Sequence, residues 1–287
     1  MLEQKGGYKT VITNEYRVDG EVGIITGAGR GIGKAIALAL AQAGADVVLA
    51  ARSREQIEQT ADEIRKLGRK ALAMPTDVAN EDQIARLVDK ATSAFEKIDI
   101  LCNCAGTLLL RPVAILPGVK LPGWEAAGDE LDKQQTLEDW NRVMDTNLTS
   151  AFLFAKALGP HMIRRRKGKV INISSIGANQ GLSYNSAYNV SKAGLSVFTR
   201  CLASEWAPFG INVNAIAPGL TNTVMIRPLV ADPEIKQTKL KDIPLGRLGE
   251  PREVALLAVF LASSASSYIT GQIITIDGGV MGRGPDI

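Results

Sequence analysis

The stretch EVGIITGAGRGIGKAIALALAQAG, residues 21–44, combines three kinds of sequence in one order. The apolar run 21–26 leads into the glycine-rich segment 27–33 and then into 34–44, where apolar residues recur at helical spacing. A strand, a glycine loop and a helix in this order open a parallel α/β sheet that binds a dinucleotide. The glycines allow a tight turn and let N–H groups at the helix N-terminus approach a pyrophosphate. The spacing T-G-x-x-x-G-x-G also fits a plain helix cap. We expect the cofactor to contact Gly27, Arg30, Gly31, Ile32 and Gly33.

The alternation of strand and helix continues along the chain. Further strand-like runs stand at 46–50, 70–78, 99–103, 169–174, 211–219 and 271–279. Helical patterns stand at 55–68, 81–98, 136–166, 186–206 and 251–263. Parallel strands joined by helices form a doubly wound sheet with helices on both faces. We therefore predict an α/β fold with seven strands. It is expected to be a single domain over residues 21–287, after a polar N-terminal arm at 1–20.

Composition excludes several classes of protein. Hydrophobic residues make up 46% and charged residues 22% of the 287 residues, which is typical of a globular chain that buries a core. The net charge is only +3, and we interpret the densest basic cluster, 164–167, as a solvated helix end, so no nucleic-acid partner is expected. No apolar run is long enough to span a membrane, and the N-terminus lacks the apolar segment of a secretory signal.

The cysteines bear on compartment and metal binding. Cys102, Cys104 and Cys201 are few enough to predict a reducing compartment, and we expect a cytoplasmic protein. Cys102 and Cys104 would suit a metal, but the sole histidine, His161, is distant in sequence and no second cysteine pair exists. Because structural zinc sites use four ligands, we predict no metal site.

The residues after the second strand bear on which dinucleotide binds. An acid about 20 residues beyond the glycines usually takes the ribose 2′-hydroxyl of NAD. Ala51 stands at that place, and Arg52 and Ser53 follow it. Arg52 and Arg30 can bind a 2′-phosphate through charge-assisted hydrogen bonds, so NADP(H) is expected over NAD(H). The alternatives are an arginine-rich surface turn and a preference for NAD.

Two long irregular segments leave strand ends of the predicted sheet. Ligands bind at the carboxyl edge of such sheets, where Asp77 and the Asn-Cys-Ala-Gly loop at 103–106 are also expected. Residues 107–135, which include Trp124, form an insertion too long for an ordinary connection. Residues 220–245 are expected to form a lid over the site. We expect these two segments and residues 176–184 to form the substrate pocket. They hold Leu, Ile, Pro, Trp124 and Met225 and few fixed charges, so a mostly uncharged carbonyl substrate is predicted.

A tyrosine and a lysine on the 186–206 helix are candidates for proton transfer. Tyr188 and Lys192 stand at i and i+4, so their side chains share one helix face. A neighbouring ammonium group favours the phenolate and should lower the pKa of Tyr188. Ser175, which follows the run 169–174, has a hydroxyl that can bind the same substrate oxygen. Alone, this spacing also occurs by chance on exposed helices. Asn147 lies inside the expected helix 136–166, where its side chain can compete for backbone hydrogen bonds. This position indicates a kink, a water site or no special role.

Taken together, these motifs resemble those of the classical short-chain dehydrogenase/reductase family over roughly residues 20–280. The matching segments are Thr26–Gly33, Asp77, 103–106, Asn147, Ser175, Tyr188-x-x-x-Lys192, Pro218-Gly219 and Thr223. The resemblance implies a Rossmann-type sheet and a homotetramer or homodimer. It implies that Tyr188 is the acid/base, that Lys192 lowers its pKa and holds the nicotinamide ribose, that Ser175 orients the substrate oxygen and that Asn147 holds a water. The further cofactor contacts that it implies are Ser53, Asp77, Val78, Asn103, Ala105, Gly106, Tyr188, Lys192, Pro218, Gly219, Thr221 and Thr223.

The sequence departs from the family pattern in three places. The second position of the usual Asn-Asn-Ala-Gly is Cys104, the segment 107–135 is longer than usual, and so is the N-terminal arm. The expected activity is NADP(H)-dependent interconversion of a carbonyl and a secondary alcohol, as in a carbonyl reductase. An NAD-preferring polyol or hydroxy-acid dehydrogenase and a non-catalytic NADP-sensing regulator are the alternatives. A 3-oxoacyl thioester, a sugar and another ketone all remain open as substrates.

Overall fold

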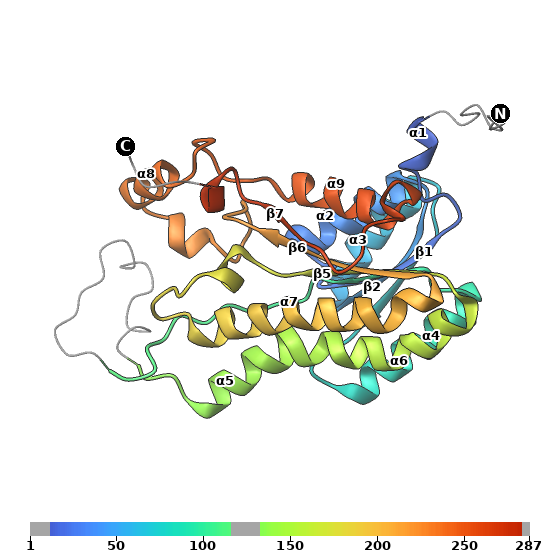
Figure 1. The fold of residues 1–287 in the computed structure, drawn as a ribbon, viewed down its shortest axis with the longest axis horizontal. Helices are drawn as coiled ribbons and strands as arrows, with labels where there is room; N and C mark the ends of the chain where they lie inside the picture. Colours follow the sequence, from blue (N-terminus) through green and yellow to red (C-terminus); the bar gives the residue numbers. More distant parts are fainter. Residues whose placement is uncertain (1–11, 116–132, 283–287) are drawn as a thin grey trace, which may run out of the picture.

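The computed structural model describes residues 12–115 and 133–282 of the chain (Figure 1). Trp124 and much of the expected insertion lie outside these residues. The strands form one parallel sheet in the order β3-β2-β1-β4-β5-β6-β7, which confirms the predicted seven-stranded α/β fold. Their bounds are β1 Val22–Thr26, β2 Asp46–Ala51, β3 Ala71–Pro75, β4 Ile100–Asn103, β5 Gly168–Ile173, β6 Ile211–Pro218 and β7 Ile273–Ile276.

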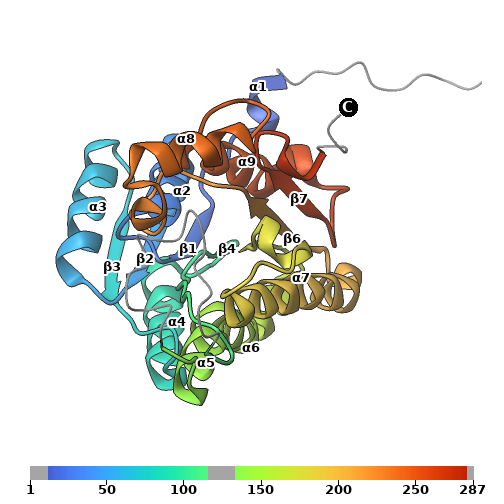
Figure 2. The same ribbon diagram turned by 90° about the vertical axis from the view of Figure 1, so that its left-hand side faces the viewer.

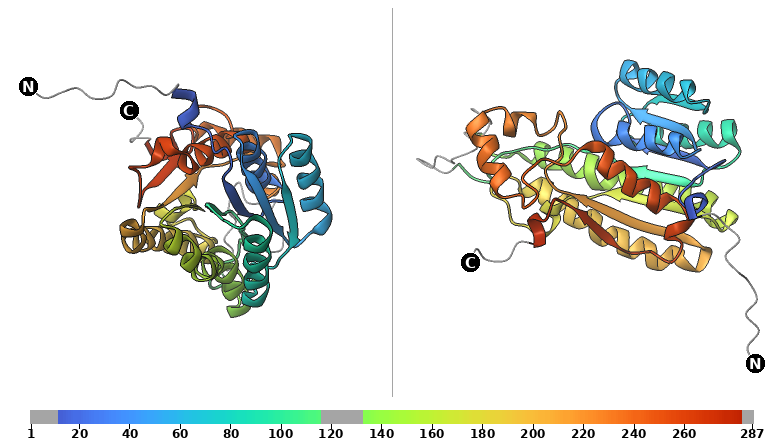
Figure 3. Two further views of the ribbon diagram at one scale, coloured as in Figure 1. Left: turned by 90° about the vertical axis from the view of Figure 1, so that its right-hand side faces the viewer. Right: turned by 90° about the horizontal axis from the view of Figure 1, so that it is seen from above.

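Helices cover both faces of this sheet, as predicted. One face is covered by α2 (Gly31–Gln42), α3 (Arg54–Lys66) and α9 (Pro251–Ala262), and the other by α4 (Glu81–Phe95), α6 (Ser150–Arg165) and α7 (Ser186–Trp206) (Figure 2). The short helices are α1 (Ile12–Glu15), α5 (Leu137–Met144) and α8 (Pro233–Lys241). Figure 3 shows the two layers from other sides, with blue and red helices on one face and green and gold helices on the other.

The central strand β1 explains why the sheet is buried on both faces. Ile24 and Ile25 are both inaccessible to solvent, and they point into opposite hydrophobic cores because successive strand side chains alternate. Continuous apolar runs of this kind are typical of parallel strands between two helix layers. Within the described ranges, no helix has the length and apolar character needed to cross a membrane.

The expected helix 136–166 is helical from Leu137 to Arg165, with one change of winding inside it. Thr136 caps α5. Its side chain accepts from the backbone N–H of Asp139, and the Asp139 carboxylate accepts from the backbone N–H of Thr136. The residues Asp145–Thr149 then form a π-helical turn before α6 begins. Asn147 lies in this turn. The sequence suggested a kink as one consequence of an asparagine at this place, and the structure has a widened helical turn there.

The interpretation of 164–167 as a solvated helix end is wrong for Arg165. Its guanidinium contacts Asp99, with 2.6 Å between Nη2 and Oδ1, and also donates to the carbonyl of Ile98. Asp99 is buried and also accepts from the backbone N–H of Val22. Arg165 therefore joins the end of α6 to the start of β1 and β4, because a buried carboxylate needs a charged partner.

Part of the expected N-terminal arm packs onto the domain. Val18 is buried, and its backbone N–H donates to the carbonyl of Ala43. The ring of Tyr16 lies 6.0 Å from that of Phe260 on α9. Residues 12–20 thus contact the layer formed by α2 and α9, and residues 1–11 lie outside the described part.

Candidate active site

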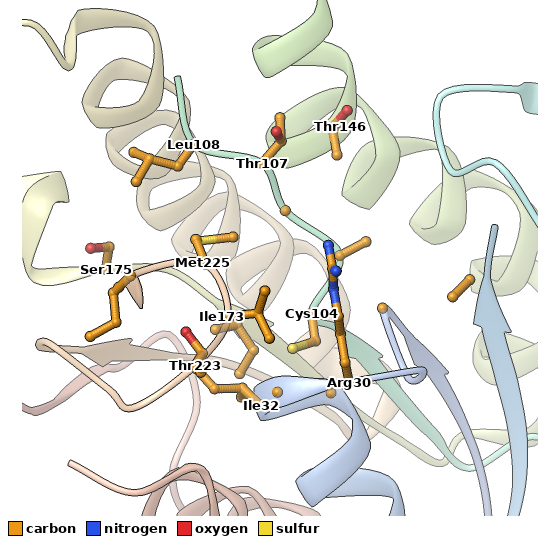
Figure 4. A pocket seen from close by; sticks show the side chains of 18 of the residues that line it. Arg30, Ile32, Cys104, Thr107, Leu108, Thr146, Ile173, Ser175, Thr223 and Met225 are labelled. Atoms are coloured by element: carbon orange, nitrogen blue, oxygen red, sulfur yellow. The ribbon is translucent and has the colours of Figure 1, made fainter. Parts of the chain in front are cut away.

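A cavity of about 1000 Å³ opens at the carboxyl edge of the sheet (Figure 4). Its walls come from the glycine loop and from the segments that follow β2, β3, β4, β5 and β6. This is the edge where open α/β sheets bind ligands. The predicted residues that line it are Gly27, Arg30, Gly31, Ile32, Gly33, Arg52, Ser53, Asp77, Val78, Ala105, Gly106, Ser175, Tyr188, Lys192, Pro218, Gly219, Thr221 and Thr223.

The glycine loop and the segment after β4 are packed tightly against each other. Gly27 has φ +67°, and a Cβ built there would lie 3.0 Å from the Cα of Ala105. The hydroxyl of Thr26 accepts from the backbone N–H groups of Cys104 and Ala105, both at 2.9 Å. A Cβ on Gly33 would lie only 2.3 Å from the carbonyl oxygen of Gly27. The N-terminus of α2 therefore approaches the loop as closely as a pyrophosphate-binding turn requires.

Basic side chains outnumber acidic ones around the cavity. Arg30 and Arg52 both line it, and Figure 4 shows Arg30 extending toward the side where Thr107 and Thr146 lie. Asp77 is the only acid among the described lining residues, and its carboxylate accepts from the backbone of Ala79. Ser53 caps α3 through the backbone N–H of Gln56 and so holds the β2–α3 turn in place.

The candidate catalytic side chains meet in the same cavity. Ser175, Tyr188 and Lys192 all line it, and α7 runs over the range that the sequence predicts, Ser186–Trp206. The Nζ of Lys192 lies 5.8 Å from the centre of the Tyr188 ring and donates to the carbonyl of Ile173 at 2.7 Å. The lysine is thus held by the end of β5, beside the tyrosine.

The pKa of Tyr188 is raised, whereas the sequence predicted that Lys192 would lower it. Burial of the phenol disfavours the phenolate, and a hydrogen bond with Ser175 acts in the opposite direction without reversing the shift. Burial also lowers the pKa of Lys192 to about 8, because the apolar surroundings disfavour its ammonium form. The same burial that brings the two groups together therefore weakens the electrostatic effect that their spacing suggested.

Two predicted site residues do not line the cavity. Asn103, expected to contact the cofactor, is buried between strands, where its Nδ2 donates to Oδ1 of Asn172 at 2.8 Å. Asn147 accepts from the N–H of Thr107 and donates to its carbonyl, and it also donates to the hydroxyl of Ser191. Its side chain thus fixes the first residue of the insertion against α7. That Asn147 holds a water stays a prediction.

Both ends of the insertion are tied to the N-terminus of α7. The backbone N–H of Arg111 donates to the carbonyl of Tyr184 at 2.8 Å. Gln135 donates through its N–H to Pro112 at 2.7 Å, and its side-chain oxygen accepts from the hydroxyl of Ser186 at 2.8 Å. These bonds connect residues 111–112 and 133–135 to the helix that carries Tyr188.

Several lining residues were not individually predicted. They are Gly29, Ala51, Gln56, Thr76, Cys104, Thr107, Leu108, Leu109, Leu110, Arg142, Thr146, Ile173, Ser174, Val224, Ile226, Pro228 and Leu229, whereas Met225 was expected in the substrate pocket and does line the cavity. Most lie within three residues of a predicted lining residue. Their position next to the carboxyl end of a strand could therefore have indicated that they line the cavity. Arg142 and Thr146 come from α5 and the π-helical turn, and sequence patterns do not show which face of these elements meets the cavity.

Comparisons with known proteins agree with this geometry. The sequence model of a family described as enoyl-(acyl carrier protein) reductase matches residues 27–281. The 2-dehydro-3-deoxy-D-gluconate 5-dehydrogenase of Pseudoalteromonas atlantica is 37% identical over 94% of this chain and 99% of its own length. A 3-oxoacyl-[acyl-carrier-protein] reductase of Synechocystis sp. is 39% identical over 91% of this chain and 97% of its own.

A solved structure supports the same assignment. The gluconate 5-dehydrogenase of Burkholderia cenocepacia, in complex with NADP and tartrate, superposes with a TM-score of 0.83 at 33% identity, covering 95% of this chain and all of that one. The named relatives are two dehydrogenases and a reductase, and the solved one contains NADP. The chain is accordingly an oxidoreductase with a Rossmann-type fold, and it belongs to the classical short-chain dehydrogenase/reductase family.

Proposed function

We propose that the protein interconverts a carbonyl and a secondary alcohol with NADP(H), using Tyr188 as the acid/base. The observation that carries this proposal is the convergence of Ser175, Tyr188 and Lys192 on the cavity that the glycine loop also lines. The glycine loop fits a dinucleotide, because side chains at Gly27 or Gly33 would collide with neighbouring backbone and narrow the turn. A bound nicotinamide supplies or accepts the hydride.

The chain's own residues act on the substrate oxygen. Ser175 donates a hydrogen bond to it and stabilises the negative charge that develops in reduction. Tyr188 gives its proton to that oxygen, and the raised pKa keeps the phenol protonated at neutral pH, ready to act as an acid. Lys192, held by Ile173, presents its ammonium group near the phenol and steadies the phenolate that forms.

Exchanging Tyr188 for phenylalanine tests this role. The variant Tyr188→Phe keeps the ring but removes the proton, so turnover should fall by about 10²–10⁴-fold while NADPH binding stays nearly normal. Steady-state consumption of NADPH against a panel of ketones, sugars and oxoacyl thioesters measures the first quantity, and fluorescence titration measures the second. Turnover close to that of the wild type would remove Tyr188 from the mechanism.

The preference for NADP over NAD is supported by the charges around the cavity. Arg30 and Arg52 line it, and Ala51 occupies the place where NAD-binding sites carry an acid. The related gluconate 5-dehydrogenase was solved with NADP. An Arg52→Ala variant should lose about tenfold or more in NADPH affinity with little change for NADH. Tighter binding of NADH than of NADPH by the wild type would overturn the assignment.

A homotetramer is the proposed assembly, built first on α6 and α7. Phe152, Val190 and Val197 on these helices are about half exposed, at 50%, 45% and 56%, which favours burial against a second copy. Leu256 on α9 is 53% exposed and offers a second such surface. Light scattering after size-exclusion chromatography tests this. Val197→Glu should dissociate the assembly, and a monomeric wild type would contradict it.

We further propose that residues 21–287 act as one catalytic domain, with 107–135 and 220–245 around the substrate. The residues Val224, Met225 and Leu229 from the second segment line the cavity, which supports its role as a lid. The described cysteines Cys102, Cys104 and Cys201 are unpaired, and this supports the cytoplasm as the compartment.

A further inference from the structure

Arg142 is a charged lining residue that the proposed chemistry does not use. It extends from α5, one turn before Thr146 on the same helix face, and both side chains line the cavity. Its side chain is 58% exposed and donates one hydrogen bond, from Nη2 to Oδ1 of Asp139 at 3.1 Å. Within residues 12–115 and 133–282, its other N–H groups have no hydrogen-bond acceptor. A guanidinium group has five donors in a planar fork, so most of them are available to a ligand.

Asp139 holds Arg142 in place but is shared with other partners. Its Oδ2 accepts from the guanidinium of Arg111 and from the backbone N–H of Thr136. Asp139 is buried, and these bonds lower the pKa of its carboxyl against the effect of burial, so the carboxylate stays charged. The Asp139 carboxylate therefore fixes the direction of the Arg142 side chain but accepts only one hydrogen bond from its guanidinium group.

One short segment leads from the proton-transfer groups toward the partner of Arg142. The extended segment from Gly106 to Arg111 starts beside Lys192, whose Nζ is 3.6 Å from a Cβ built on Gly106. It ends at Arg111, beside Asp139, and five residues can span at most about 16 Å. Between the two ends, Leu108, Leu109 and Leu110 line the cavity. Apolar side chains thus line the cavity along the segment that joins the neighbourhood of Lys192 to that of Asp139, the partner of Arg142.

We propose that Arg142 binds a carboxylate of the substrate, and that this carboxylate is joined to the reacting carbonyl by an apolar body. The substrate class is then a keto acid, or the matching hydroxy acid, whose charged end is several bonds from the reacting carbon. This inference rests on the proposed oxidoreductase function and replaces the mostly uncharged substrate that the sequence suggested. Guanidinium pairs with carboxylate through two parallel hydrogen bonds, which supplies both affinity and orientation.

The rival interpretations make different predictions. If Arg142 only forms the i, i+3 ion pair with Asp139, its removal should barely shift the urea midpoint and leave substrate choice unchanged. If it binds a phosphate of the cofactor, its removal should weaken NADPH binding for every substrate. A substrate-binding role should affect anionic substrates alone.

The test compares keto acids of increasing chain length with their methyl esters, using NADPH and the variants Arg142→Met and Arg142→Lys. Arg142→Met should lower kcat/KM for the preferred acid by about 10- to 100-fold, mainly through KM, and leave the ester within about twofold. Arg142→Lys should recover part of the loss, because it restores the charge without the planar fork. Arg164→Met, which removes an exposed arginine on α6, is the matched control and should behave like the wild type.

Calorimetry distinguishes a failure of this proposal from a failure of the proposed function. Acid and ester are titrated into the NADPH-saturated wild type and Arg142→Met, so binding is measured whether or not turnover occurs. Equal affinity of the wild type for acid and ester overturns the proposal, as do equal losses for both ligands or weaker NADPH binding in Arg142→Met. If acid binds more tightly than ester but neither is reduced, the carboxylate site stands and the proposed reaction falls.

Discussion

Adding one methyl group at Gly33 should weaken NADPH binding by one to two orders of magnitude. The Cβ of an alanine would lie 2.3 Å from the carbonyl oxygen of Gly27 and 2.7 Å from its carbonyl carbon. Ordinary contacts of carbon with a carbonyl oxygen are about 3.3 Å or longer, so the N-terminus of α2 must retreat by roughly 1 Å. The loop cannot retreat instead, because Gly27 packs on Ala105 and Thr26 holds that segment through two hydrogen bonds.

The expected magnitude follows from this displacement. Overpacking of a tight contact costs about 1–3 kcal/mol, and the helix N-terminus that would bind the pyrophosphate moves with it. At 1.4 kcal/mol per decade, the Kd for NADPH should rise by about 10- to 100-fold. Fluorescence titration of NADPH measures the Kd, and urea unfolding measures the accompanying loss of stability.

A matched control is available in the same strand–loop–helix unit. A Cβ on Gly23 in β1 would lie 3.6 Å from Ile100 and Ile25 side-chain atoms, which is an ordinary van der Waals distance. Gly23→Ala should therefore bind NADPH within about twofold of the wild type. Wild-type affinity in Gly33→Ala would refute the reasoning, and an equal loss in Gly23→Ala would show that the effect is not specific to the loop.

Three further predictions concern stability. Replacing Asp99 by alanine should lower the free energy of unfolding by about 3 kcal/mol, because it leaves Arg165 without its buried partner. Lowering the pH from about 7.5 to 5 should destabilise the protein, because His161 must then take up a proton. Burial and then the nearby arginines lower the pKa of His161, so the fold favours its neutral form. In that form Nε2 accepts from the backbone N–H of Ile98 at 3.1 Å. Thr26→Val should cost about 2 kcal/mol and weaken NADPH binding, because the partly buried N–H groups of Cys104 and Ala105 lose their acceptor.

Each of these predictions has a distinct control. Lys156→Ala is the control for Asp99→Ala. It breaks an ion pair with Glu81 in which both side chains are about 60% exposed, so it should lower the free energy of unfolding by well under 1 kcal/mol. The stability due to neutral His161 is fully present above its unfolded pKa of about 6.5 and is lost as the pH falls toward the depressed folded value. The urea midpoint of a His161→Ala variant should therefore change less between about pH 7.5 and 5 than that of the wild type. Thr26→Ser keeps the hydroxyl, and if it loses as much NADPH affinity as Thr26→Val, the hydrogen bonds are not the cause.

The sequence was most informative where local pattern and packing agree. The range of α7 and the seven strands could be predicted, because apolar periodicity and glycine or proline punctuation mark them directly. The glycine loop could be placed at the carboxyl edge because parallel strands all end there. Tyr188 and Lys192 could be paired because their spacing fixes them to one helix face.

The remaining features depend on tertiary contacts that no local pattern records. The π-helical turn at Asp145–Thr149 arises where Asn147 bonds to Thr107 and Ser191, far away in sequence. Arg165 was assigned to solvent because its neighbours are basic, but its partner Asp99 belongs to another element. The pKa of Tyr188 was predicted in the wrong direction, because spacing shows which charges are near and does not show how deeply the phenol is buried.

The hydrogen bonds at the two ends of the insertion have an evolutionary consequence. Because Pro112 and Gln135 are joined to each other and Arg111 to Tyr184, the chain between them begins and ends at fixed points. Closing a longer loop between such points adds only about 0.6 kcal/mol for each doubling of its length. Descendants of this chain can therefore exchange the intervening segment without disturbing the helix that carries Tyr188, the proposed acid/base. Recognition of new molecules and preservation of the hydride chemistry become traits that can diverge independently, and transplanting a relative's segment between these anchors is a practical route to altered selectivity.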